Sequence, residues 1–143
     1  MNRPEDIMEK LGYYSAVVHG FSMYPLLVDH KDSVYIEKTD TFKKYDVLLF
    51  RRKDGQLVLH RLIGFSDDML VLCGDNDFIA EKIYKNQVIG IMKEFSHNGK
   101  VYKVNNIWYK IYSKVWNLSF TTKRMLRFIY SSFNKVKSKL VRK

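Results

Sequence analysis

The chain has 143 residues, of which 46% are hydrophobic and 28% are charged, and this balance is typical of a soluble domain with a core. Its single cysteine, Cys73, excludes an internal disulfide and has no Cys/His cluster around it, so neither an oxidised scaffold nor a zinc site is expected. No stretch approaches the roughly 18 consecutive apolar residues of a membrane span, and the first residues lack the apolar run of a secretory signal. We therefore expect a cytoplasmic protein that needs no metal and no organic cofactor.

The net charge of +10 is unevenly distributed along the chain. Residues 1–94 contain 13 Lys and Arg against all 15 Asp and Glu, whereas residues 95–143 contain 12 Lys and Arg and no acid. Such a split is typical of a protein with an anionic partner, either a membrane face or a nucleic acid. A solvated basic helix face is the alternative interpretation.

The first elements in chain order are a short helix and a series of strands. A helix is predicted over 4–11, because Pro4 suits its first turn and two acids follow. Alternation of apolar and polar residues predicts strands over 15–19, 33–37, 46–51, 57–64, 69–73, 88–95 and 100–104. Turns are expected at Asp54-Gly55, at 66–68 and at 97–99. The body is thus predicted to be mainly β.

The pattern changes to a helical period after Asn106. We predict two amphipathic helices with a break near 117–122; their apolar positions are Trp108, Ile111, Tyr112, Val115 and Trp116, then Met125, Ile129, Phe133 and Val136. This divides the chain into a β domain over 1–104 and a basic helical tail over 105–143. Aromatic faces flanked by lysines suit an anionic membrane interface, so residues 106–143 are expected to bind one, with nucleic acid less favoured. Packing of the first helix on the β body is the alternative.

Ser22 is the candidate nucleophile, because it follows a strand and Gly20 and precedes a turn at Pro25. A serine at such a strand end exposes its hydroxyl, and backbone N–H groups of the turn can face a developing oxyanion. An ordinary turn or capping role is the alternative.

His60 is the candidate base, because it lies on the returning strand among apolar neighbours that favour the neutral imidazole. A hydrogen-bonded core histidine is the alternative. Arg61 is expected on the opposite face, toward solvent or Asp46. The segment 73–81 supplies three carboxylates that compete to orient His60, namely Asp75, Asp77 and Glu81.

Four motifs in this order resemble the superfamily of type I signal peptidases and SOS-repressor peptidases over about residues 15–95. They are Gly20-x-Ser22-Met23-x-Pro25-Leu26, Asp46-Val47-Leu48-Leu49-Phe50, His60-Arg61-Leu62-Ile63 and Gly74-Asp75-Asn76. The histidine motif is similar to that of the endoplasmic-reticulum and archaeal type. The resemblance implies a coiled, barrel-like antiparallel β fold, with a short N-terminal helix and C-terminal amphipathic helices here.

By the same resemblance, Ser22 is the nucleophile and His60 the general base, while Gly20, Phe21 and Met23 bind an extended substrate by strand addition. Glu81 stands in the place of the family acid, and Asp75 is the alternative. If neither residue has this role, the acid is missing from this chain. The implied function is a serine endopeptidase that cleaves a peptide or protein precursor. The basic tail leads us to expect that this occurs at the inner membrane face. The alternatives are a non-catalytic peptide-binding module with a basic tail and, less favoured, a self-cleaving regulator.

Overall fold

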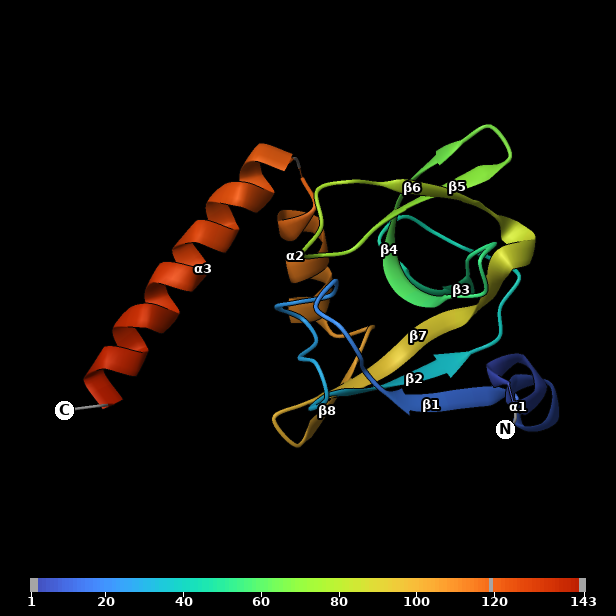
Figure 1. Cartoon of the computed structure of the whole chain (residues 1–143), viewed down its shortest axis with the longest axis horizontal. Helices are drawn as coiled ribbons and strands as arrows, with labels where there is room; N and C mark the ends of the chain where they lie inside the picture. Colours follow the sequence, from blue (N-terminus) through green and yellow to red (C-terminus); the bar gives the residue numbers. More distant parts are fainter. Residues whose placement is uncertain (1–2, 119, 142–143) are drawn as a thin grey trace.

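The structure is a computed structural model that describes residues 3–118 and 120–141 (Figure 1). Eight antiparallel strands form one sheet in the order β1-β2-β7-β3-β4-β5-β6, with β8 paired to β7. The strands are β1 (Tyr13–Val17), β2 (Ser33–Glu37), β3 (Val47–Arg51), β4 (Leu57–Ser66), β5 (Met69–Cys73), β6 (Glu81–Tyr84), β7 (Val88–His97) and β8 (Lys100–Lys103). The mainly β prediction is confirmed. The sheet curls without closing, since β1 and β6 are its edges in the described chain, so it is not a complete barrel.

Burial on both faces of β3 explains why the sheet curls. Val47 and Leu49 belong to one apolar cluster with α1, β2 and β7, whereas Leu48 and Phe50 belong to a second cluster with β4, β5 and β6. The register shifts by one residue at 35/36, 49/50 and 62/64, and such bulges bend and twist a sheet.

The predicted turns are confirmed by the strand pairings. A five-residue connection containing Gly55, at φ 90°, joins β3 to β4. Two-residue turns join β4 to β5 and β7 to β8; the second has positive φ at both Asn98 and Gly99, as hairpin turns matching the strand twist require.

The described part of the chain has three α-helices, and η1 (Lys85–Gln87) is a short 3₁₀ turn before β7. Helix α1 (Pro4–Leu11) ends at Gly12, whose left-handed φ of 79° allows its N–H to bond the carbonyl of Met8. Helix α2 (Ile107–Trp116) lies against the sheet, whereas α3 (Phe120–Val141) extends away from it, at the opposite end of the molecule from α1 (Figure 1). None of the described helices combines the length and apolar character needed to cross a bilayer.

The differences from the predicted elements have local causes. The first strand covers 13–17 rather than 15–19, because Val18 leaves the sheet and its N–H and C=O bond Asp32 and His30. Strand β6 was not predicted from the sequence. Only Ile83 of its four residues is buried, so the alternation of apolar and polar residues is too short to indicate a strand. The break between the last two helices is shorter than predicted, since α3 begins at Phe120. Ser119, which belongs to the predicted break, lies outside the described part of the chain.

Candidate active site

Ser22 lies in an irregular loop between β1 and β2, two residues after Gly20, which has a φ of 92°. The Gly20 N–H donates to Oδ1 of Asp29 at 2.7 Å, which closes the base of this loop. Ser22 is half-buried, and its carbonyl accepts the Asn76 N–H at 2.8 Å. Within the described part of the chain, the N–H groups of Ser22 and Met23 donate no backbone hydrogen bond.

His60 is buried on β4 and faces two carboxylates. Its Nδ1 lies 2.9 Å from Oε1 of Glu81, and its Nε2 lies 3.4 Å from Oδ2 of Asp77. The Nδ1 contact is close but poorly aligned for a hydrogen bond, so it is an electrostatic contact in this conformation. Arg52 holds Glu81 from the far side through two hydrogen bonds of 2.9 and 2.7 Å. Arg52, Glu81 and His60 thus form a row of side chains in which Glu81 contacts both of the others.

The electrostatics of this row favour a neutral base beside a charged acid. Burial lowers the pKa of His60, and the carboxylates of Glu81 and Asp77 oppose this effect only in part. Burial by itself raises the pKa of Glu81, but the hydrogen bonds and charge of Arg52 outweigh burial, and the net pKa is lowered. Near neutral pH, His60 can therefore accept a proton while Glu81 stays ionised.

The turn at 74–77 joins the Ser22 loop to His60. Its Asn76 N–H holds the carbonyl of Ser22, and its Asp77 carboxylate faces His60. Gly74 is packed between these partners, since a β-carbon at this position would collide with the Asp77 carboxylate and with the Ser22 carbonyl. The structure therefore brings the predicted nucleophile and base to the two sides of one turn, without a direct hydrogen bond between them.

A cavity of about 600 Å³ opens beside the Ser22 loop. Its walls come from the Ser22 loop, the 74–77 turn, α2 and one face of α3, and they include Phe21, Tyr24, Asn76, Trp116, Arg127 and Tyr130. Phe21, one of the predicted substrate-binding residues, is exposed and lines this cavity. The Met23 side chain is buried in the core and does not line the cavity, so only its backbone is left for the strand addition predicted for it.

Asp75 and Arg61 form a buried ion pair, in contrast to two sequence predictions. Both side chains are fully buried, and Arg61 donates to the two carboxylate oxygens at 2.8 Å each. Tyr112 donates to the same carboxylate at 2.9 Å. Arg61 does not face solvent, because α2 covers it and Ser113 accepts one of its N–H groups. The Asp75 carboxylate is thus engaged, and the acids that contact His60 are Glu81 at Nδ1 and Asp77 at Nε2.

The C-terminal helices also hold the 74–77 turn. The indole N–H of Trp116 donates to the carbonyl of Asp75 at 2.7 Å, and Lys123 donates to the carbonyl of Gly74 at the same distance. Lys123 is buried, which is unusual for a lysine unless its charge is satisfied. Sequence reasoning missed Arg52, Trp116 and Lys123, because their partners are distant in sequence and no motif marks them.

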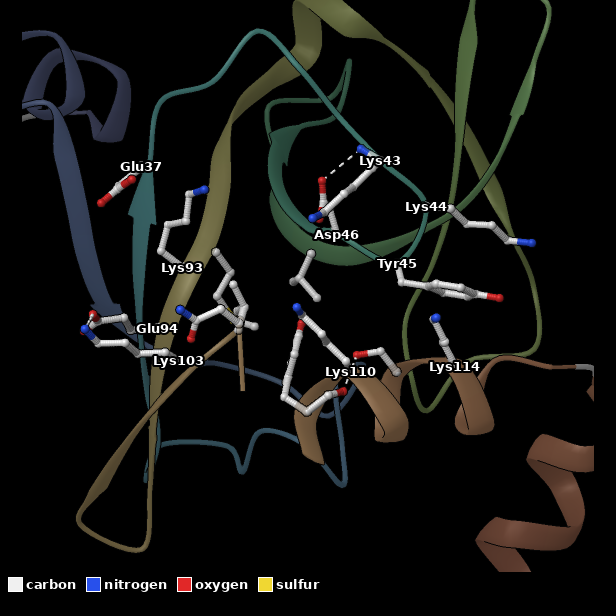
Figure 2. Close-up of a pocket in the computed structure, with 16 residues that line it drawn as sticks. Glu37, Lys43, Lys44, Tyr45, Asp46, Lys93, Glu94, Lys103, Lys110 and Lys114 are labelled. Carbon is white, nitrogen blue, oxygen red and sulfur yellow. Dashed lines mark hydrogen bonds and ion pairs between the residues drawn. The ribbon is translucent and has the colours of Figure 1, made fainter. Parts of the chain in front are cut away.

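A second cavity, of about 550 Å³, lies between α2, β7 and the 43–47 segment (Figure 2). Six lysines line it against three acids; the lysines are Lys43, Lys44, Lys93, Lys103, Lys110 and Lys114. Lys110 and Lys114 rise from α2 toward the cavity, facing the side of Asp46 and Tyr45 (Figure 2). Like the first cavity, it is lined by neither Ser22 nor His60. Its excess of positive charge favours an anion over a neutral peptide.

Comparison with known proteins adds no family to this picture. No family model matches the sequence, and no curated protein is detectably similar to it. The functional argument therefore depends on the residues of the chain.

Proposed function

We propose that this chain is a serine endopeptidase of the signal-peptidase type, in which Ser22 is the nucleophile and His60 the general base. The observation that carries the proposal is the 74–77 turn, which bonds the Ser22 backbone at one end and presents Asp77 to buried His60 at the other. Glu81 supplies the orienting carboxylate on the Nδ1 side. Three groups with the required roles thus surround one turn next to a cavity.

The chemistry follows the general acyl-transfer scheme. Nε2 of His60 takes the proton of the Ser22 hydroxyl as the oxygen attacks a peptide carbonyl, and the N–H groups of Ser22 and Met23 stabilise the oxyanion. The imidazolium then protonates the leaving amine, and the acyl-enzyme ester remains on Ser22. Water attacks this ester with the same base, which releases the second product and restores the serine.

The scheme gives Asp77 and Glu81 different roles, and the difference can be tested. The Asp77 carboxylate lies near Nε2 of His60, the nitrogen that must receive the serine proton. In our proposal the bound substrate displaces this carboxylate from Nε2, whereas Glu81 keeps its place through Arg52. Asp77→Ala should therefore retain cleavage, while Glu81→Gln should slow it.

The test is mass spectrometry of a peptide library incubated with the full chain and anionic liposomes. The wild type should cleave, Ser22→Ala and His60→Ala should lose at least about 10³-fold in rate, and Ser66→Ala is the matched control that keeps it. Circular dichroism verifies that each variant folds, which matters most for His60→Ala because this histidine is buried. Cleavage by Ser22→Ala would refute the mechanism. Absence of cleavage by folded wild type would favour the peptide-binding alternative.

We also propose that α3 binds an anionic bilayer. One face of α3 lines the cavity, whereas the opposite face carries an exposed apolar stripe, formed by Met125, Ile129, Phe133, Val136 and Leu140. Lysines flank the stripe, and no acid follows residue 94. An exposed apolar face with cations beside it matches a lipid surface, where rings and alkyl groups enter and cations meet headgroups.

Liposome flotation of the full chain tests this partner. Binding should require anionic lipid and should be lost in Phe133→Ser, while Val101→Ser, which removes an exposed apolar residue on β8, should still float. Retained flotation of Phe133→Ser and Ile129→Ser together would contradict the stripe. Failure to float combined with salt-dependent DNA binding would replace lipid by nucleic acid.

A further inference from the structure

Three residues with metal-binding side chains converge at the base of the Ser22 loop. His19 follows β1, while Asp29 and His30 lie in the return segment before β2. Two backbone hydrogen bonds of 2.8 Å hold these segments together: the His30 N–H donates to the carbonyl of Val18, and the Val18 N–H donates to the carbonyl of Asp32. His30 has a positive φ of 57°, a conformation that a residue with a side chain adopts infrequently.

The side chains form a compact set of ligand atoms. The rings of His19 and His30 lie with their centroids 4.5 Å apart and nearly perpendicular, at 77°. Nε2 of His30 is 3.5 Å from Oδ1 of Asp29, and the ligand atoms of all three residues lie within 4.8 Å of one another. The Gly20 N–H bonds the Asp29 carboxylate, as outer partners commonly do for metal ligands. Both histidines are exposed, so an ion can enter from solvent.

We propose that His19, Asp29 and His30 form a binding site for a divalent transition metal of the zinc class. Two imidazoles and one carboxylate are ligands that zinc accepts, and three protein ligands leave a position for water. No metal was expected from the sequence, because the chain lacks a Cys/His cluster. The proposed site instead depends on the loop that brings residue 19 close to residues 29 and 30. Ions at this point would tie together the two ends of residues 20–28, the segment that carries Ser22.

Isothermal titration of the full chain with Zn²⁺ tests the proposal, which is independent of the peptidase function. We expect one ion per chain, with binding weakened at least tenfold in His19→Gln and in His30→Asn. Asparagine is chosen at position 30 because it tolerates the positive φ and keeps the loop conformation. His60→Gln is the matched control that removes a histidine elsewhere, and it should bind zinc as the wild type does.

Hydrogen exchange provides a second readout that needs no activity. Zinc should slow exchange of the amides in residues 20–28 in the wild type and in His60→Gln, but not in His30→Asn. The proposal is overturned if the wild type binds no zinc, if folded His30→Asn binds it equally well, or if His60→Gln alone loses it.

Discussion

Replacing Arg61 by methionine is expected to destabilise the chain strongly, because the substitution leaves the Asp75 carboxylate buried without its cation. Both side chains have 0% exposure, and Arg61 donates to Asp75 through two bonds of 2.8 Å. It also donates to the carbonyl of Tyr45 and to Ser113, so α2 and the β3 entry lose an anchor as well. Removing one partner of a buried ion pair costs about 3–5 kcal/mol.

This loss is a large share of the stability of a domain, which is about 5–15 kcal/mol in total. For a chain of this size it corresponds to a fall of about 10–20 °C in Tm. Urea unfolding followed by circular dichroism measures the free energy of unfolding directly. The matched control is Lys103→Met, which breaks the exposed 3.7 Å pair of Lys103 with Glu94 and should cost less than about 1 kcal/mol.

A second variant separates the ion pair from the packing of its neighbours. In Arg61→Met/Asp75→Leu the unpaired charge is gone, so the double variant should be more stable than Arg61→Met alone. The reasoning is refuted if Arg61→Met and Lys103→Met lose similar free energies, or if removing the Asp75 charge from Arg61→Met brings a further loss.

Three further predictions concern the site. Burial lowers the pKa of His60 below its usual 6.5, so the acid limb of kcat/KM should lie below pH 6.5, and Glu81→Gln should move this limb to still lower pH. For the same reason the folded protein should lose stability as the pH falls below 6.5, because the unfolded chain takes up this proton more readily than the folded chain does. Gly74→Ala should abolish cleavage, whereas Gly64→Ala, where an added β-carbon meets nothing within 4 Å, should be tolerated in the same assay. Lys123→Met should cost about 1–3 kcal/mol in urea unfolding, since it leaves the buried Gly74 carbonyl without its donor.

The strands and turns were predictable because their signals are local. The alternation over 69–73 and the helical start at Pro4 give elements with the predicted bounds, and the Asn98-Gly99 pair fits the hairpin found there. The early end of β1 at Val17 was not predictable, since the bonds that draw Val18 out of the sheet come from residues 30 and 32.

The sequence indicated which residues are candidates for the site but not which of them contact one another. The sequence offered three carboxylates for His60, and only the folded chain shows Glu81 and Asp77 beside it and Asp75 bonded to Arg61. Strand alternation places Arg61 opposite His60, but it cannot show that α2 covers that face, because this depends on contacts between residues about fifty positions apart.

The two faces of α3 have a geometric consequence for any substrate. An α-helix is about 10–12 Å wide, and 22 residues span about 33 Å. Since the cavity beside Ser22 lies on one face and the apolar stripe on the other, a surface touching the stripe lies about one helix width from the cavity. If α3 rests on lipid through the stripe, as we propose, the width of the helix would set the distance between the bilayer and the site at which a bound precursor is cleaved.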